Sequence, residues 1–416
     1  MFNLLKKRGV LFISLSNAVS QLGDRLTYMV IVTLIGIMSP GQMTAYSEFS
    51  ITFTLPVILL SPFVGVIIDH SNKRQVILRC HLMQSILIFL TPAVVAFSNS
   101  SIPIWTVVVL FFSLDVFNNT ARNSLVPDLV DYQQLVPANA IITTIARIAT
   151  FAGMVGGGLF IKWVGWQLGF YIDATTHLIA GLLVLGIGAR YLFEPVKKVD
   201  ISLRKELKNA LKLFINDLKE LLILLRRDRM VIFVMISVMM LPFVAAIAHT
   251  VLVFMIQQTF GLGTAGVGLL GGIIGLGMLL GGIVMGLFGK KFSRGSIILF
   301  SIAVLTILFI TGPIFLSTAF LYAMSLISGM LFSFIGISQD TILQEDVAKA
   351  IRGRIFATKE FFVNITFLSA SVSVGLISKL FNPLLIIQLI GFFLLLIFIF
   401  TLLIYRSIPK EIRAKL

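Results

Sequence analysis

Charged side chains stand at several points where nearly every neighbouring residue is apolar. Asp24 and Arg25 are adjacent within SQLGDRLTYMV, residues 19–29, and Asp115 and Arg147 lie in two later apolar stretches. An ionisable group deep in an apolar environment is costly unless it is paired or hydrated, so each is a candidate functional group. Burial favours the neutral form of a carboxylic acid and a nearby cation favours its charged form, so such a set can bind and release a proton. We therefore expect proton coupling by Asp24 or, as second candidate, Asp115, with Arg25 or Arg147 as the tuning charge.

A structural role is the alternative for the same residues: a permanent ion pair that holds three apolar segments together. Neighbouring residues on a helix point about 100° apart, so Asp24 and Arg25 cannot face the same way. We expect one of them to face a central cavity. The other should face a neighbouring helix, towards Asp115 or Arg147.

Several other ionisable residues are expected to have plainer roles. Arg122 and Asp173 lie nearer the ends of their apolar stretches, where snorkelling to the surface accounts for a charge. His177 and His249 are interpreted as packed or interfacial side chains. Because no His, Asp and Glu cluster has metal-ligand spacing, we expect no metal and no cofactor.

The composition is that of an integral membrane protein. Of 416 residues, 58% are hydrophobic and 12% charged, and the mean hydropathy is +1.02; soluble domains average about 45–50% apolar and about 25% charged. The net charge of +15 does not indicate a nucleic-acid partner, because the basic residues fall in short clusters between apolar segments. The single cysteine, Cys80, permits no intramolecular disulfide and no cysteine-based metal cluster.

Twelve apolar segments are long enough to cross a membrane as helices, which need about 20 residues each. The first runs past the length of a signal peptide and lacks a clear cleavage site, so we interpret it as an uncleaved span. Barrel strands would be short and alternating, so the predicted fold class is an all-α integral membrane protein. The expected spans are residues 10–38, 45–68, 75–97, 102–121, 135–161, 167–190, 229–258, 265–289, 295–315, 318–343, 355–379 and 382–405.

Positive charge gathers in alternate loops. Basic residues precede the first span, follow the second, eighth and tenth, and close the chain, whereas the loops SPGQMTA and SNSSIPI carry none. Basic loops stay on the cytoplasmic side, so we expect both termini to be cytoplasmic.

Two halves are predicted, joined by a basic linker: residues 1–190, 191–228 and 229–416. Leu and Phe recur at helical spacing through the linker with Lys and Arg between them, which predicts an amphipathic helix on the cytoplasmic membrane face. We interpret it as a lipid-anchored connector, with regulation as the alternative. GVIIDHSNKRQVIL (65–78) aligns without a gap with GLFGKKFSRGSIIL (286–299). This likeness indicates related halves, an architecture that secondary transporters use around a central site.

The turn GVIIDHSNKR is the most specific local motif. Gly65 is followed by Asp69 after three residues and then by the basic pair Lys73 and Arg74. This spacing resembles the loop signature of the major facilitator superfamily. The resemblance implies twelve transmembrane helices in two pseudo-symmetric six-helix halves, which Lys73 and Arg74 help to latch together on the cytoplasmic side.

The resemblance also implies how the latch would work. Asp69 would act at a helix N-terminus or on a basic side chain of the other half, where Arg352 and Arg354 are the candidates. His70 stands where the family has a permanent base, which would make the latch sensitive to pH. Asn72 stands where glycine is usual, and asparagine tolerates the left-handed conformation.

A glycine-rich segment, AGMVGGG (152–158), lies in the fifth span. It resembles the signature that antiporters of the superfamily carry in that helix, except that Met154 stands at the proline position. Gly153, Gly157 and Gly158 would equally well serve close helix packing. The segments 121–140 and 343–357 occupy corresponding places in the two halves. They resemble the macrolide-efflux and enterobactin-exporter branch.

Together these features predict a secondary transporter and not an enzyme. We expect a proton-coupled antiporter that exports a lipophilic or amphipathic small molecule, as multidrug efflux proteins do, by alternating access in a bacterial cytoplasmic membrane. The alternatives are a lipid or lysolipid transporter of the same fold and a non-transporting sensor or scaffold. The expected partners are the substrate, protons and membrane lipids, and the protein is expected to be a monomer.

Overall fold

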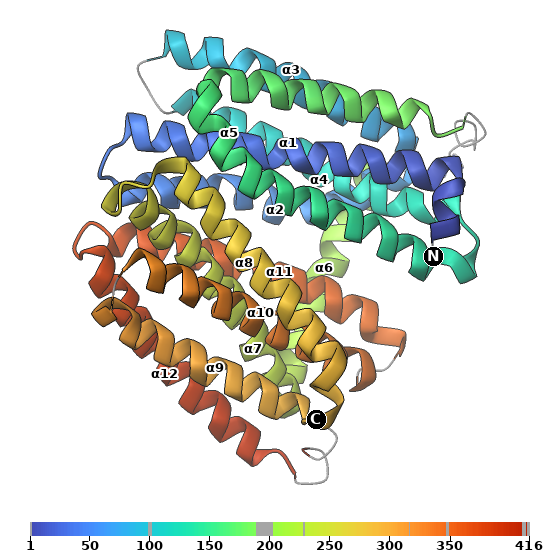
Figure 1. Ribbon diagram of the computed structural model, residues 1–416. Coiled ribbons are helices and arrows are strands. Elements are labelled where there is room, and N and C mark those ends of the chain that lie inside the picture. The colour runs from blue at the N-terminus through green and yellow to red at the C-terminus, as the bar shows by residue number, and fades with distance from the viewer. Residues whose placement is uncertain are drawn as a thin grey trace. The chain divides into compact units, whose positions relative to one another are not determined.

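The chain is helical throughout the part that the structure describes. The computed structural model describes residues 2–98, 102–188, 203–227, 229–315, 317–346, 349–409 and 413. Within these ranges every long element is a helix (Figure 1), and eleven helices are long and apolar enough to cross a membrane. The predicted all-α, multi-pass membrane fold is confirmed.

Five long helices come first along the chain. The starts of the first four lie within two residues of the predicted spans, and α4 continues eight residues past its predicted end, through the polar segment 122–129. The five helices are α1 (Arg8–Met38), α2 (Met43–Asp69), α3 (Lys73–Phe97), α4 (Ile102–Leu129) and α5 (Leu135–Leu185).

Two predicted spans are joined within α5. Gly165 interrupts its 51 residues with φ 83° and ψ 167°, a conformation that glycine adopts readily and other residues do not. The chain changes direction there, so that Gly169 packs against Ile161 and a Cβ at Gly169 would collide with it. The predicted spans 135–161 and 167–190 are therefore the two arms of α5, which is why eleven helices account for twelve spans.

The second part begins with the predicted amphipathic helix, α6. The next helix, α7, passes into two π-helical turns, η4 (Ala248–Leu252) and η5 (Met255–Thr259), a feature often found at functional sites. The helices of this part are α6 (Leu203–Arg227), α7 (Arg229–Ile247), α8 (Gly263–Phe288), α9 (Arg294–Thr311), α10 (Thr318–Asp346), α11 (Lys349–Ile377) and α12 (Pro383–Ser407).

Matching helix caps support the repeat seen in the sequence. Asn72 caps α3 by accepting a hydrogen bond from the backbone N–H of Gln75 at 3.0 Å. Ser293 caps α9 by accepting one from the N–H of Ser296 at 3.3 Å. Asn72 and Ser293 occupy the same position in the aligned segments 65–78 and 286–299. Each side chain satisfies a backbone donor that a helix start leaves open, so the two helices begin for the same reason.

The chain packs into two compact units. Unit 1 comprises Met1–Pro40, Thr52–Lys212 and Leu262–Leu269, and unit 2 comprises Gly41–Ile51, Leu213–Gly261 and Leu270–Leu416. The first turns of α2 thus pack within unit 2, and the first turns of α8 pack within unit 1. Both units expose large apolar side chains, such as Trp163 at 81% and Leu380 at 77%, as surfaces that face lipid do.

Candidate functional site

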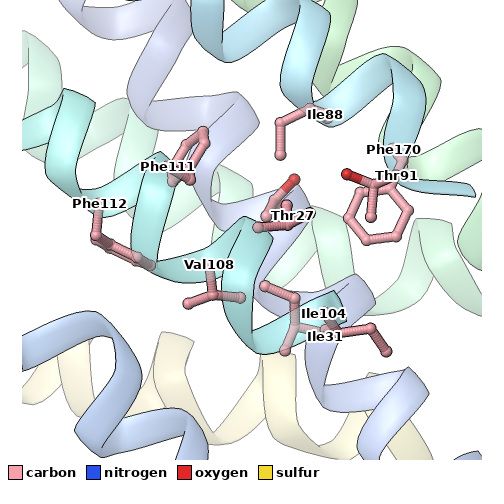
Figure 2. Close-up of a pocket in the computed structure, with 10 residues that line it drawn as sticks. Thr27, Ile31, Ile88, Thr91, Ile104, Val108, Phe111, Phe112 and Phe170 are labelled. Atoms are coloured by element: carbon pink, nitrogen blue, oxygen red, sulfur yellow. The ribbon is translucent and has the colours of Figure 1, made fainter. Parts of the chain in front are cut away.

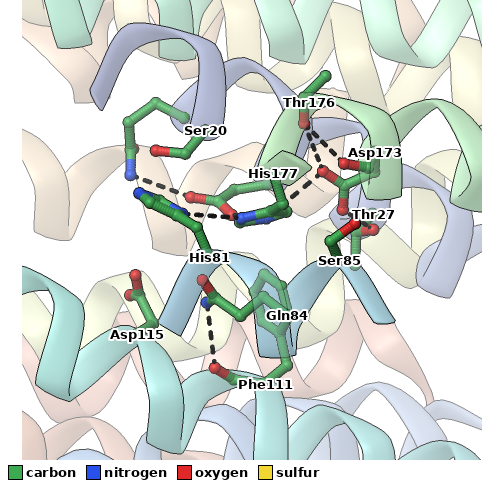
Figure 3. Close-up of polar contacts among 12 residues, drawn as sticks. Ser20, Thr27, His81, Gln84, Ser85, Phe111, Asp115, Asp173, Thr176 and His177 are labelled. Carbon is green, nitrogen blue, oxygen red and sulfur yellow. Dashed lines mark hydrogen bonds and ion pairs between the residues drawn. The ribbon is translucent and has the colours of Figure 1, made fainter. Parts of the chain in front are cut away.

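Unit 1 contains a buried cluster of two carboxylates and two imidazoles, which we call the histidine–carboxylate cluster: Asp24, His81, Asp173 and His177. His177 Nε2 lies 3.2 Å from Asp24 Oδ1 and 3.6 Å from Asp173 Oδ1. On the other edge of the ring, His177 Nδ1 lies 3.2 Å from His81 Nδ1 (Figure 3). The Asp173 side chain is fully buried, those of both histidines nearly so, and that of Asp24 is 13% exposed.

Helix geometry and a glycine bring the cluster together. Asp173 and His177 are four residues apart in α5, so both side chains point to the same face of the helix. Gly23 lets α1 approach this face closely, since a Cβ there would collide with the side chains of Thr176 and Asp173. The next residue in α1 is Asp24, which is thereby set beside His177.

Asp173 is held by hydroxyl groups. Thr27 of α1 donates a hydrogen bond to Asp173 Oδ2, and Thr176 Oγ1 donates one to Asp173 Oδ1 at 3.0 Å. A carboxylate that is buried without such partners loses its interactions with water, and nothing replaces them. The two hydroxyls, with His177 nearby, allow Asp173 to remain in a site that water does not reach.

Asp24 has one oxygen engaged and one turned to His177. Its Oδ2 accepts a hydrogen bond from Gln21 Nε2 at 3.0 Å, and Gln21 Oε1 accepts one from Thr150 at 3.2 Å. Asp24 Oδ1 and His177 Nε2 are within ion-pair distance, and neither atom has a hydrogen-bond partner among the described residues. The interaction between these two atoms is therefore electrostatic. A proton on His177 would make the ring positive and strengthen its attraction to Asp24.

The charges of α4 act on the same cluster. Asp115 accepts a hydrogen bond from Asn119 Nδ2 at 2.8 Å and interacts electrostatically with Asp24, Arg122 and His177. The Arg122 guanidinium donates a hydrogen bond to the side-chain oxygen of Asn17 in α1. Asp115, the second candidate proton carrier, thus belongs to the surroundings of the cluster but does not contact His177 directly.

The formal charges of this region differ by one. Its carboxylates are Asp24, Asp115 and Asp173, and the guanidinium groups that act on Asp115 are Arg25 and Arg122. If all three carboxylates are ionised and both histidines are neutral, one negative charge is left unbalanced. One added proton would balance it.

The two expected tuning charges, Arg25 and Arg147, lie in different surroundings, and Arg25 is among the cations that act on Asp115. Arg147 is exposed on α5, and no described contact links it to Asp24. The stem of Arg25 packs against α5 at Gly153, and its Nε is buried without a hydrogen-bond partner among the described residues. The closest base to Asp24 is instead His177, and the interpretation of His177 as a merely packed side chain missed this contact.

Asp173 corrects a second expectation. We expected the Asp173 carboxylate to reach the surface by snorkelling, but the side chain is fully buried. An aspartate side chain is too short to reach water from this depth, and the hydroxyls of Thr27 and Thr176 stabilise it in place. The sequence signal that could have identified it is Asp173 and His177 at helical i, i+4 spacing inside an apolar stretch.

The loop between α2 and α3 contacts other parts of unit 1. Lys73 Nζ lies 2.7 Å from Asp128 Oδ2 at the end of α4. Arg74 is buried and donates to the carbonyl oxygens of Val184 at 2.9 Å and Leu185 at 2.5 Å. These are among the last carbonyls of α5, which have no partner within the helix, so Arg74 caps it.

The remaining latch residues are less constrained. Asp69 is the last residue of α2 and is exposed, and no described side chain hydrogen-bonds to it. His70 contacts Glu206 of α6. A Cβ at Gly65 would meet nothing within 4 Å, so no close helix approach requires glycine there. Arg352 and Arg354 lie in α11, and their side chains are outside the described ones.

The glycines of the fifth span lie at close helix contacts. A Cβ at Gly153 would lie 2.8 Å from Arg25 Cβ, and one at Gly157 would lie 3.2 Å from Leu26 Cδ2. A Cβ at Gly158 would lie 2.9 Å from Gly268 Cα at the start of α8. All three positions therefore keep neighbouring backbones close within unit 1.

A small apolar pocket adjoins the cluster (Figure 2). Thr27, which bonds to Asp173, forms part of its wall, as does Phe111, whose ring edge meets the His177 ring at a centroid distance of 5.3 Å. The cluster therefore has an apolar neighbour on the α4 side. The lining residues are Thr27, Ile31, Ile88, Thr91, Ile104, Val107, Val108, Phe111, Phe112 and Phe170. Among the described residues no group of His, Cys, Asp and Glu has the arrangement of a metal site.

Comparison with known proteins assigns relatives to the chain. The sequence pattern of the Major Facilitator Superfamily matches residues 13–366. The putative bacilysin exporter BacE of Bacillus subtilis is 25% identical over 358 residues, which are 80% of this chain and 84% of that protein. Macrolide efflux protein A of Enterococcus faecalis is 24% identical over 314 residues, which are 73% of this chain and 91% of that protein. The resemblance indicated by the loop motif is confirmed.

Solved structures show the same fold. The nucleoside transporter NupG has a TM-score of 0.73 at 14% identity, covering 94% of this chain and 99% of that one. A bacterial homologue of the iron transporter ferroportin, in an inward-facing state, has a TM-score of 0.69 at 14% identity, covering 95% and 98%. At these identities the likeness is one of fold alone.

Proposed function

Because the chain belongs to the Major Facilitator Superfamily, we propose that it is a proton-coupled exporter of a lipophilic or amphipathic small molecule that works by alternating access. Its family and its efflux relatives make it a multi-pass membrane transporter and not an enzyme. The proposal adds the coupling ion, the substrate class, the bacterial cytoplasmic membrane as location and the cytoplasmic position of both termini.

The contact between Asp24 and His177 is the observation that carries proton coupling. Histidine changes charge more readily than other side chains between about pH 5 and pH 8. His177 lies between Asp24 and Asp173, so a proton on its ring gains two ion pairs and removes the unbalanced negative charge of the region. When the proton leaves, the region again has one unbalanced negative charge. The deprotonated cluster therefore attracts cations more strongly than the protonated cluster does.

Alternating access would connect this site to the two sides of the membrane in turn. The proton binds at the cluster from the outer side and leaves to the cytoplasm, and the substrate travels outward on the same cycle. The moving parts in this proposal are residues 1–190 and 229–416, joined by residues 191–228. The names of the efflux relatives support an amphipathic substrate.

The α2–α3 loop would serve as the cytoplasmic latch. Lys73 and Arg74 are engaged within unit 1 and fix the loop to the ends of α4 and α5. Asp69 is exposed at the end of α2 and remains available for a partner on the other half, such as Arg352 or Arg354. Replacing Asp69 by Asn should shift purified protein towards the inward-open state in distance measurements between spin labels. An unchanged distribution would count against the latch.

Transport in proteoliposomes tests the coupling. Vesicles that are acidic inside should accumulate ethidium, a cationic amphipathic dye, when they contain the wild-type protein, because lumenal protons leave as dye enters. Asp24→Asn should abolish this accumulation, since the amide cannot ionise. Asp131→Asn is the matched control, because Asp131 is 79% exposed and pairs with Lys7 away from the cluster.

The same vesicles separate drug export from lipid transport. Movement of ethidium supports the proposed exporter, whereas movement of a fluorescent lysolipid without ethidium would favour the lipid carrier. If Asp24→Asn transports either probe at the wild-type rate under the pH gradient, proton coupling at Asp24 is wrong.

A further inference from the structure

Two buried histidines of unit 1 face each other through their Nδ1 atoms. His81 of α3 and His177 of α5 are each 1% exposed, and their Nδ1 atoms lie 3.2 Å apart. The rings are tilted by 41° with centroids 5.5 Å apart, so this is an edge contact and not a stacked pair. Gly181 of α5 allows the approach, since a Cβ there would lie 3.3 Å from His81 Cβ.

A contact between the Nδ1 atoms of two neutral histidines has one hydrogen atom between the two nitrogens. A neutral imidazole has one N–H donor and one acceptor nitrogen, so one Nδ1 donates and the other accepts. If His177 Nδ1 carried the hydrogen, its bare Nε2 lone pair would face the carboxylates of Asp24 and Asp173. If His81 Nδ1 carries it, His177 is free to hold its own hydrogen on Nε2 and point it at Asp24. The second arrangement is electrostatically favoured while both carboxylates are charged.

We propose that His81 is a proton-relay residue that charges His177 without any side chain moving. This inference rests on the proposed function and deepens it. A proton binds the unprotonated Nε2 of His81; the Nδ1–H bond of His81 then breaks and an N–H bond forms at His177 Nδ1. His81 ends neutral with its hydrogen on Nε2, and His177 ends as an imidazolium with both nitrogens protonated. The proton count rises by one, and the positive charge lies at His177.

The surrounding charges favour that direction. Burial disfavours a positive charge on His81, and so do the nearby charges of His177 and Arg122. The carboxylates, in contrast, stabilise a positive charge on the second ring. Those that act on His177 are Asp24, Asp115 and Asp173. The positive charge is therefore more stable on His177 than on His81, although the proton arrives at His81.

Histidine-selective NMR on the full-length protein in nanodiscs tests the relay directly. The chain has four histidines, so their ring nitrogens can be assigned by single substitutions. At high pH we expect hydrogens on His81 Nδ1 and His177 Nε2. On acidification His177 should gain a second hydrogen while His81 changes from the Nδ1–H to the Nε2–H form and stays neutral. A His81 ring that keeps one tautomer throughout, or that becomes cationic before His177, overturns the proposal.

His81→Gln separates relay from structure. Glutamine can still donate a hydrogen bond to His177 but cannot pass a proton on. We expect ethidium accumulation driven by a pH gradient to fall about tenfold or more, as for loss of a proton-transfer group. Exchange of labelled for unlabelled ethidium without a gradient should persist. His249→Gln, a histidine replaced in unit 2, is the matched control.

The outcomes distinguish this inference from the proposed function. If Asp24→Asn abolishes accumulation but His81→Gln has the wild-type rate and pH profile, the exporter stands and the relay is wrong. If neither variant affects accumulation, the proposed coupling fails, and the wild-type NMR spectra still decide whether His81 switches tautomer. If His81→Gln does not fold, those same spectra decide the question alone.

Discussion

Units 1 and 2 bury polar groups in different ways. In unit 1 the buried side chains include Asp173, Arg74, His81 and His177, and the partly exposed Asp24 joins them. In unit 2 the buried polar side chains of the described residues are hydroxyls and one amide, Gln339, without a carboxylate among them. Among the buried side chains of the described residues, unit 1 thus has groups that change charge, whereas those of unit 2 only donate and accept hydrogen bonds. The Lys359–Asp340 ion pair of unit 2 is partly exposed.

The contrast is clearest at the histidines. His177 lies between two carboxylates, whereas His249 of unit 2 shares a 2.8 Å hydrogen bond with Ser50 and has the rings of Phe49 and Phe367 beside it. A proton on His177 gains ion pairs with Asp24 and Asp173. We therefore expect His177 of unit 1 to be the histidine that takes part in proton coupling.

Replacing one histidine at a time should have the largest effect on the rate of transport. His177→Gln removes the base between Asp24 and Asp173, and we expect accumulation of ethidium under a pH gradient to fall about 100-fold. His249→Gln should retain most of the wild-type rate. The comparison is made from initial rates in proteoliposomes at equal protein content. Equal losses in both variants would show that the units do not differ in this respect.

Close packing at the cluster should matter next. Gly23→Ala forces a Cβ into Thr176 and Asp173, and overpacking of this kind costs about 1–3 kcal/mol. Gly156→Ala is the control, because a Cβ there meets nothing within 4 Å. Thermal unfolding in detergent should show a lower midpoint for Gly23→Ala only. A wild-type midpoint would mean that α1 and α5 are not held together at Gly23.

Unit 2 should respond in stability and not in coupling. Ser50→Ala deletes the hydroxyl beside His249, and loss of one such hydrogen bond costs about 0.5–1.5 kcal/mol. We expect a slightly lower unfolding midpoint and an unchanged dependence of transport on pH. A shifted pH profile would assign a proton-coupling role to His249 and blur the contrast between the units.

The smallest effect is expected at the loop between α2 and α3. Asp128→Asn breaks the pair with Lys73, and since Asp128 is 46% exposed the loss should be about 0–1 kcal/mol and should shrink further at high salt. Unfolding midpoints at low and high salt measure it. A loss that does not depend on salt would mean that the pair is not exposed to solvent.

Much of the fold was predictable because the membrane requires long apolar helices. Spans as clear as 75–97 and 382–405 were found within two residues of α3 and α12. The join at Gly165 was not predicted, because a glycine between two apolar segments does not reveal whether helical hydrogen bonding continues across it. The π-helical turns after Ile247 were also missed. Their segments AHTVL and MIQQT are more polar than the helix before them, but polarity does not reveal a change in the spacing of the backbone hydrogen bonds.

The candidate site was predictable only in part. Asp24 and Asp115 were found from their type and depth alone. Their partners were not, because which residues meet across helices depends on rotation about each helix axis, which an apolar sequence leaves open. His81 and His177 are far apart in the sequence, and their contact depends on Gly181 letting α3 approach α5.

The claim that the Asp24–His177 pair carries the proton is tested most directly by measuring two modes of transport in the Asp24→Asn variant. Both are measured in the same vesicles with ethidium: exchange without a gradient, and accumulation driven by an acidic lumen. If the Asp24–His177 pair carries the proton, exchange should continue at a rate close to wild type while accumulation disappears. Accumulation that persists alongside exchange would contradict the claim that unit 1 couples transport to protons through this pair.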